Sequence, residues 1–290
     1  MAPAEAENRV VIVEMSPRDG LQNEPAPVPT SDKIALVDRL SGCGFTRIEV
    51  TSFVSPKWVP QLADATEVMA GIQRKPGVRY AALTPNMQGF EKALAAGADE
   101  IAVFASASES FSRKNINCSI AESIERFRPV AAASRAHGIP MRGYVSCVVR
   151  CPYEGAVPPA SAADVAHRLE ELGCYEISLG DTIGRGEPDE IVRMLDAVLA
   201  NLPAARLAGH FHDTSGRALD NIAVALDHGL RVFDASVAGL GGCPYAPGAK
   251  GNVDTLAVDR YLKAGGFETG LSAERLEEAA AFARNLRSAP

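Results

Sequence analysis

One unit recurs along this chain: a helical stretch, a glycine, and then a short run of β-forming residues. Ala93–Gly97 leads into Glu100–Phe104, and Leu169–Gly173 leads into Tyr175–Leu179. A glycine just past a helix adopts the left-handed conformation that ends it, so the run after each glycine is predicted to be the next strand. With similar runs elsewhere, the predicted strands are Val10–Met15, Arg47–Val50, Val78–Leu83, Glu100–Phe104, Met141–Val145, Tyr175–Leu179, Leu207–Phe211 and Arg231–Val237.

Strands that alternate with helices over 290 residues predict an α/β protein with a (β/α)8 TIM-barrel fold. A doubly wound open sheet is the alternative, and a Gly-x-Gly-x-x-Gly turn after the first strand would favour it. Residues 16–20 read Ser-Pro-Arg-Asp-Gly instead. We expect a single catalytic domain over residues 1–290, with the barrel at about 9–265 and an additional C-terminal helical segment at about 266–290.

Composition narrows the class of partner. A formal net charge of −7 and a pI near 5.4 argue against a nucleic-acid or anionic-membrane surface. No apolar run is long enough to span a bilayer, and the first residues do not resemble a signal peptide. The six cysteines are scattered without a Cys-x-x-Cys pair, which is typical of reduced thiols. We therefore expect a cytoplasmic enzyme for a small molecule, and we expect it to be a homodimer.

His210 and His212 stand two residues apart behind an apolar lead-in. On a β-strand, residues i and i+2 point to the same face, so both rings converge on one spot. Neutral imidazole is the commonest metal ligand, and two on one face make half of a site. A polar strand end is the alternative interpretation, and the choice depends on which other residues reach the same point.

A TIM barrel would bring further polar residues to that point, because its active sites lie at the C-terminal ends of the strands. Asp19 follows the first predicted strand, and the first, seventh and eighth strands lie side by side in a closed barrel. Asn252 ends the glycine-rich loop after the last strand and can offer a carbonyl oxygen. Nitrogen and oxygen ligands without thiolate favour Mg²⁺ or Mn²⁺, although the same set also suits Fe²⁺ or Zn²⁺.

The loop over residues 237–252 contains five glycines from Gly239 to Gly251 in addition to two prolines and Cys243. Such a loop exposes its backbone and is suited to closing over a ligand. A surface thiol beside a cation is a candidate proton carrier or nucleophile. A passive small residue in a tight turn is the alternative role for Cys243.

Seven stretches of the chain resemble 3-hydroxy-3-methylglutaryl-CoA lyases, and the likeness runs from about residue 9 to 265. The stretches are Ser16–Glu24, Thr51–Lys57, Lys114–Ser119, Arg142–Cys147, Cys174–Thr182, His210–Asp213 and Ser236–Tyr245. The last of them, Ser-Val-Ala-Gly-Leu-Gly-Gly-Cys-Pro-Tyr, is close to a signature of that family.

The resemblance implies a TIM barrel that cleaves 3-hydroxy-3-methylglutaryl-CoA to acetyl-CoA and acetoacetate by a retro-Claisen reaction. It implies a divalent cation on Asp19, His210, His212 and Asn252. It also implies catalytic roles for Arg18 and Cys243, with polar support from Gln22, Glu49, Tyr144 and Asp181. In this scheme Asp19 takes the hydroxyl proton, Arg18 stabilises the enolate, and Cys243 protonates the departing acetyl-CoA carbon. We add Lys114 as a candidate contact for the coenzyme A phosphates.

The chain departs from the family at two places that concern the acyl carrier. Pro25 stands where many members carry a lysine, and the chain ends in Arg-Asn-Leu-Arg-Ser-Ala-Pro where many carry Asn-Arg-Lys. A related metal-dependent aldolase or Claisen-condensing enzyme is the nearest alternative, but those enzymes usually read Arg-Asp-Gly-Glu-Gln and His-x-His-Asn. This chain has Leu21 and Asp213 at the differing positions. A non-catalytic barrel that senses CoA esters is the alternative from another class.

Overall fold

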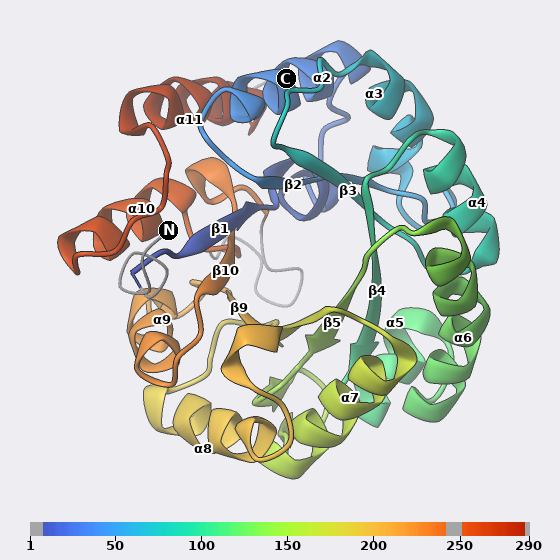
Figure 1. Ribbon diagram of the computed structural model, residues 1–290, viewed down its shortest axis with the longest axis vertical. Helices are drawn as coiled ribbons and strands as arrows, with labels where there is room; N and C mark the ends of the chain where they lie inside the picture. Colours follow the sequence, from blue (N-terminus) through green and yellow to red (C-terminus); the bar gives the residue numbers. More distant parts are fainter. Residues whose placement is uncertain (1–7, 242–250, 288–290) are drawn as a thin grey trace.

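The computed structural model describes residues 8–241 and 251–287. Within them a parallel sheet closes into a barrel in the order β1-β10-β9-β8-β5-β4-β3-β2, which confirms the predicted TIM barrel (Figure 1). Each predicted strand overlaps one of its members. The strands are β1 (Val11–Glu14), β2 (Arg47–Ser52), β3 (Arg79–Leu83), β4 (Glu100–Ser106), β5 (Met141–Ser146), β8 (Glu176–Asp181), β9 (Leu207–Phe211) and β10 (Val232–Ala235).

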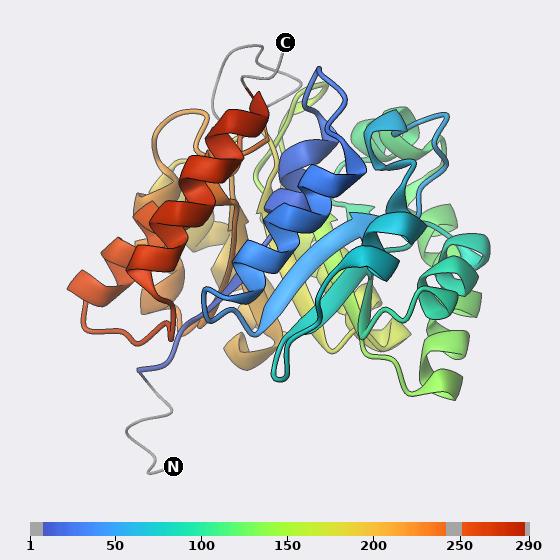
Figure 2. The ribbon, with the colours of Figure 1, turned by 90° about the horizontal axis from the view of Figure 1, so that it is seen from above.

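Helices surround the barrel and cover its outer face (Figures 1 and 2). They are α2 (Thr30–Ser41), α3 (Ala65–Gly71), α4 (Met87–Ala95), α5 (Glu109–Ile116), α6 (Ile120–His137), α7 (Pro159–Leu172), α8 (Pro188–Leu199), α9 (Ala218–Asp227), α10 (Thr255–Ala264) and α11 (Ala273–Arg287). The predicted C-terminal helical segment is α11, which packs against α2 beside the end of α10. None of the helices in the described ranges is both long and apolar enough to cross a bilayer.

Short helical turns and one small hairpin interrupt the βα series. They are η1 (Ser16–Gly20), η2 (Pro60–Leu62), η3 (Ala204–Arg206), η4 (Val237–Gly239), β6 (Arg150–Cys151) and β7 (Gly155–Ala156). The hairpin was not predicted, because strands of two residues are too short to show a hydrophobic period.

The predicted glycine stops are confirmed by the backbone. Gly173 ends α7 at a φ of +110°, and Gly138 ends α6 at +66°. A residue with a side chain rarely adopts such angles, which is why glycine punctuates these boundaries. At the other end of α6, Ser119 and Glu122 form a reciprocal capping box that satisfies free backbone N–H groups.

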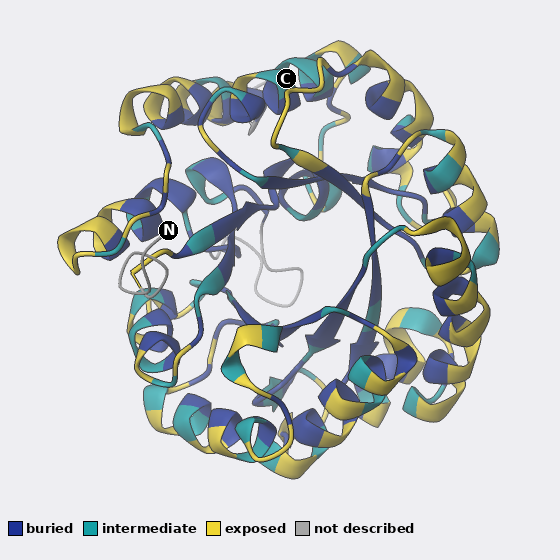
Figure 3. Cartoon of the chain, viewed as in Figure 1, coloured by how far each residue is buried: buried dark blue, intermediate teal, exposed yellow. Residues whose placement is uncertain are grey.

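Two kinds of core result from the closed sheet. Between barrel and helices the core is apolar, and Figure 3 shows the strands buried while the helices expose their outer faces. Inside the barrel, ionised side chains reach across from strand to strand. Arg47 on β2 pairs with Glu176 on β8 at 2.7 Å, and Arg142 on β5 pairs with Asp234 on β10 at 2.8 Å. Neither pair joins neighbouring strands, so these charged side chains must lie in the barrel interior.

Candidate active site

The residues predicted to hold a cation come together at the C-terminal mouth of the barrel. Asp19 lies on η1, shortly after β1, while His210 lies near the end of β9 and His212 directly follows that strand. The two imidazole ring centres are 5.2 Å apart, as expected for residues on one strand face. A backbone bridge between His212 and Asn252 places the end of the glycine-rich loop beside them. The neighbouring positions of β1, β10 and β9 confirm the predicted strand adjacency.

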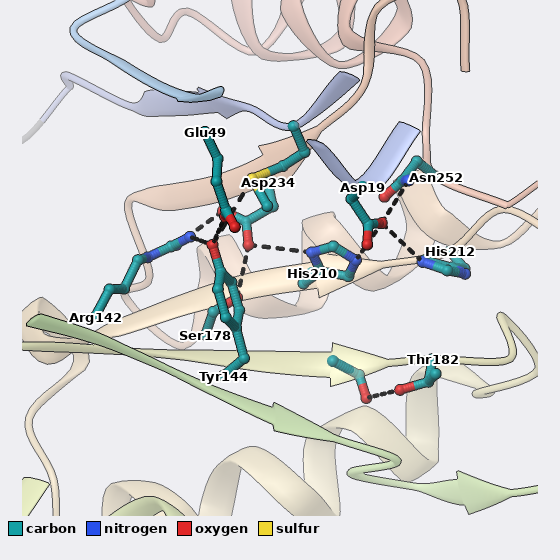
Figure 4. Close-up of polar contacts among 12 residues, drawn as sticks. Asp19, Glu49, Arg142, Tyr144, Ser178, Thr182, His210, His212, Asp234 and Asn252 are labelled. Carbon is teal, nitrogen blue, oxygen red and sulfur yellow. Dashed lines mark hydrogen bonds and ion pairs between the residues drawn. The ribbon is translucent and has the colours of Figure 1, made fainter. Parts of the chain in front are cut away.

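The spacing of the donor atoms fits a metal ion. Candidate ligand atoms of Asp19, His210 and His212 all lie within 4.8 Å of one another. Asp19 Oδ2 is 3.9 Å from His210 Nε2 and 4.0 Å from His212 Nε2, which is too long for hydrogen bonds (Figure 4). With ligand bonds of about 2.0–2.4 Å, two ligands of one ion stand roughly 3–4.5 Å apart. This donor set therefore fits a divalent cation.

Asn252 lies within reach of the same point. Its side-chain amide is 2.8 Å from Asp19 Oδ2 and also contacts the backbone oxygen of Leu240 at 3.3 Å. The amide nitrogen faces Asp19, and rotating the amide group by half a turn presents its oxygen instead. Asn252 is 4% exposed, so its side-chain amide has little contact with solvent.

The charges around this cluster separate the roles of its members. Burial raises the pKa of Asp19, but the charges of Arg18 and His210 outweigh it and lower that pKa to about 2. Burial and the neighbouring His210 lower the pKa of His212 to about 4, so this imidazole is neutral at neutral pH. Burial also lowers the pKa of His210, but the hydrogen bond and charge of Asp234 produce a net rise. The Asp19 carboxylate is thus ionised and a weak proton acceptor.

Arg18 lies beside the group formed by Asp19, His210 and His212, which we call the cation cluster. Two guanidinium nitrogens of Arg18 are held by carboxylates. Its Nη1 is 2.5 Å from Asp19 Oδ1, and its Nε donates to Glu49 Oε1 at 2.8 Å. Its guanidinium carbon is 5.7 Å from the centre of the Tyr144 ring. In residues 8–241 and 251–287 its Nη2 has no hydrogen-bond partner, and Arg18 lines the cavity at the barrel mouth. A donor is therefore available to a bound molecule.

The position of Glu49 along its strand differs from the prediction. It was expected at the end of its strand, but β2 continues to Ser52 and Glu49 sits inside the barrel with 1% exposure. The expected strand ended too early because Thr51 and Ser52 are polar, although both are buried. The Glu49 carboxylate accepts hydrogen bonds from Arg18 and from the Tyr144 hydroxyl. It holds these two side chains and is not part of the cavity lining.

A cavity of about 740 Å³ opens beside the cluster. Arg18, Asp19, Tyr144, His210 and His212 all line it, as do Gln22 and Lys114. Its other lining side chains include polar ones, such as Asn86 and Arg126, and apolar ones, such as Trp58 and Phe104. Its size and mixed lining are typical of a small-molecule site.

Two further candidates from the sequence stand apart from this lining. Asp181 is fully buried at the end of β8, and its Oδ2 accepts the backbone N–H of Gly186 at 2.8 Å. Burial raises its pKa to about 6. Asp181 is absent from the cavity lining and instead holds the loop after β8. Cys243 falls outside the described residues.

Asp234 and Arg142 were not predicted to belong to the site. Asp234 contacts His210 Nδ1 at 3.1 Å, and Arg142 contacts Asp234 at 2.8 Å and the Tyr144 hydroxyl at 3.0 Å. A signal was present, because a charged residue in the middle of a predicted strand is unusual in a barrel core. Both occur at such positions, in Phe233-Asp234-Ala235 and Met141-Arg142-Gly143.

Comparisons with known proteins agree with this geometry. A family model described as HMGL-like matches residues 9–283. A cytoplasmic 3-hydroxy-3-methylglutaryl-CoA lyase of Danio rerio is 59% identical over 273 residues, covering 94% of this chain and 82% of that protein. The crystal structure of an HMG-CoA lyase from Brucella melitensis has a TM-score of 0.96 at 66% identity, covering 97% of this chain and 99% of that one.

A more distant structure carries ligands. It is an HMG-CoA lyase from Acinetobacter baumannii in complex with coenzyme A and 3-methylmalate, with a TM-score of 0.92 at 36% identity over 97% of this chain and 92% of that one. The family model spans nearly the whole chain, and the relatives match it over most of their own lengths. This chain belongs to the HMGL-like family.

Proposed function

We propose that this protein is a carbon–carbon lyase that cleaves 3-hydroxy-3-methylglutaryl-CoA to acetyl-CoA and acetoacetate with the help of a divalent cation. The observation that carries the proposal is the convergence of Asp19, His210 and His212 beside a buried arginine at one cavity. Family membership supports the substrate, because the relatives named above are lyases of this thioester. The alternative, an aldolase or condensing enzyme, has no comparable support.

Asp19, His210, His212 and Asn252 are the residues that would hold the cation. Their nitrogen and oxygen donors suit Mg²⁺ or Mn²⁺, and no thiolate is among them. When bound there, such an ion supplies Lewis-acid polarisation of substrate oxygens. The low pKa of Asp19 keeps this carboxylate charged for that purpose over the whole physiological range.

Arg18 is the group proposed to stabilise the enolate of the departing acetyl-CoA. Breaking the carbon–carbon bond moves an electron pair toward the thioester, whose oxygen gains negative charge. A guanidinium is permanently charged and planar. Because Glu49 holds Nε and Asp19 holds Nη1, the direction of Nη2 is also set. Preorganised donors of this kind act in the transition state at no cost of reorganisation.

The two proton transfers are assigned to Asp19 and Cys243. Asp19 stands at the cation cluster, next to the place where a substrate hydroxyl would bind, and it is our proposed acceptor of the hydroxyl proton. Its low pKa requires that the hydroxyl be acidified when the transfer occurs. Cys243 is our proposed donor to the acetyl-CoA carbon, on the strength of the sequence signature around it.

Substrate contacts are proposed for Gln22, Tyr144 and Lys114, which line the cavity. Lys114 lies near the end of α5, with its ammonium 5.1 Å from the Tyr153 ring, and a charge there is suited to phosphate groups. Asp181 is proposed to act indirectly, through the loop that it holds.

Product analysis tests this function. Purified protein and 3-hydroxy-3-methylglutaryl-CoA should give equal amounts of acetyl-CoA and acetoacetate, with activity lost in EDTA and restored by Mg²⁺ or Mn²⁺. A sensor of CoA esters would bind the thioester and release neither product, with or without chelator. Turnover only with a 2-oxo acid or another 3-hydroxyacyl-CoA would favour the aldolase or condensing enzyme.

Two finer proposals accompany the function. A cytoplasmic location is supported by the five described cysteines, which are all free thiols, and by the name of the Danio rerio relative. A homodimer stays a prediction from the sequence, and sedimentation velocity at micromolar concentration measures it directly.

A further inference from the structure

Two buried charged side chains stand behind the cation cluster, outside the roles assigned so far. Asp234 on β10 is 2% exposed, and Arg142 on β5 is 1% exposed. Burying a charge is costly unless it is paired and hydrogen-bonded. Among the described residues, the side-chain contacts of Asp234 are with His210 and with two groups that hold the carboxylate still.

The carboxylate of Asp234 is held by three donors. Arg142 Nη2 donates to Oδ1 at 2.8 Å, and the hydroxyl of Ser178 donates to Oδ2 at 2.7 Å. The third contact, 3.1 Å long, joins Oδ2 to His210 Nδ1 (Figure 4). An ionised carboxylate only accepts hydrogen bonds, so the shared proton belongs on Nδ1 of the imidazole. Nε2 is then left with its lone pair, and Nε2 is the atom 3.9 Å from Asp19.

Arg142 extends the arrangement toward the other half of the site. Its Nη1 donates to the Tyr144 hydroxyl at 3.0 Å, and that hydroxyl donates to Glu49. Glu49 in turn holds Arg18. The Arg142 guanidinium therefore contacts Asp234, behind His210, and also Tyr144. Through Tyr144 and Glu49 it is connected to Arg18.

We propose that Asp234 is a positioning residue of the active site: it fixes the tautomer and the ring orientation of His210 for cation binding, and Arg142 holds Asp234 in place. This inference rests on the cation site of the proposed function. Partners of this kind behind a metal-binding histidine orient the ring and raise its basicity, and replacing one typically weakens metal binding about 10–100-fold.

A purely structural role for the same ion pair makes a different prediction, and the chain offers a matched control. Glu176 is a second buried carboxylate on Arg142, accepting from its Nε at 2.8 Å, and it also pairs with Arg47. No contact joins Glu176 to His210 among the described residues. Asp234→Asn and Glu176→Gln therefore remove equivalent charges from one arginine, but only the first touches the cation ligand.

The first experiment measures Mn²⁺ affinity by electron paramagnetic resonance in the wild type, Asp234→Asn, Glu176→Gln and His210→Ala. We expect Mn²⁺ to bind about 10–100-fold more weakly to Asp234→Asn and within about twofold of wild type to Glu176→Gln. Equal affinities in Asp234→Asn and Glu176→Gln overturn the positioning role. If His210→Ala also binds Mn²⁺ as the wild type does, the cation site itself is wrong, which separates the two failures.

The second experiment does not need Asp234→Asn, so it remains decisive if that variant does not fold. The chain has five histidines, few enough to resolve by long-range proton–nitrogen correlation of histidine-labelled protein saturated with Mg²⁺. A His210 variant assigns the signal. We expect the proton of His210 on Nδ1, and a proton on Nε2 overturns the proposal.

Discussion

Replacing Arg18 by glutamine removes the permanent cation and keeps a polar side chain of nearly the same reach. The guanidinium now holds Asp19 at 2.5 Å and Glu49 at 2.8 Å, with 8% of its side chain exposed. Neither carboxylate is stranded by the change, because Asn252 still donates to Asp19 and Tyr144 still donates to Glu49. The variant should therefore fold, which makes its kinetics informative.

The expected loss of kcat follows from removing the guanidinium donor that Arg18 presents to the cavity. Removing one preorganised donor to a developing oxyanion typically costs about 10²–10³ in kcat, or roughly 2.7–4 kcal/mol. Cation binding should move in the other direction or not at all, because the change takes a positive charge away from the ligand Asp19. A fall in kcat without a loss of cation affinity therefore indicates this role of Arg18, whereas collapse of the site would lower both kcat and cation affinity.

Steady-state kinetics with 3-hydroxy-3-methylglutaryl-CoA and a Mn²⁺ titration test the reasoning together. The control is Arg47→Gln, which removes a buried arginine that pairs with Glu176 inside the barrel and does not line the cavity. It should lower the melting temperature with little effect on kcat. A kcat for Arg18→Gln within a factor of a few of wild type would refute the role of Arg18 at the enolate.

Three further predictions use other parts of the site. His212→Ala should raise the Kd for Mn²⁺ at least about tenfold, measured by calorimetry, whereas alanine at the exposed His167 should not; an unchanged Kd in both would remove His212 from the cation site. Cys243→Ser should lower kcat strongly with KM little changed, because a thiol of pKa ~8.5 gives up its proton far more readily than a hydroxyl, and near-normal turnover would exclude the thiol from the mechanism. Gly241→Ala should lower activity and weaken Mn²⁺ binding while the barrel stays folded, because the φ of Gly241 is +97° and the added Cβ would lie 2.8 Å from Asn252 Nδ2. Wild-type activity and Mn²⁺ affinity in this variant would show that the backbone at Gly241 adapts.

Much of the barrel could be predicted because its signals are local. The glycine after a helix and the β-rich run after it are read within ten residues, and Gly138 and Gly173 adopt the left-handed angles this requires. The alternation of a strand is equally local. That is why His210 and His212 could be expected to share a face before any partner was known.

Errors arose where burial, and not residue type, decided the structure. β2 continues through Thr51 and Ser52 because the barrel buries them, although polar residues usually mark a strand end. Glu49, near the end of the predicted strand Arg47–Val50, therefore lies deeper in the barrel than that strand end indicated. The polar support that the resemblance implies for Asp181 stays a prediction, and its carboxylate accepts the backbone N–H of Gly186 in the loop that follows it.

The sequence by itself thus determined the order of the elements, the fold class and the meeting of Asp19, His210 and His212 at one point. The tertiary structure alone decided what stands behind them. Asp234 and His210 are 24 residues apart, and Arg142 and Asp234 are 92 apart, so no local pattern links them. They meet because closing the sheet places β10 beside β9 and directs Arg142 of β5 across the interior. Strand periodicity is a property of neighbouring residues, whereas the partner of a buried charge depends on register and closure of the whole barrel.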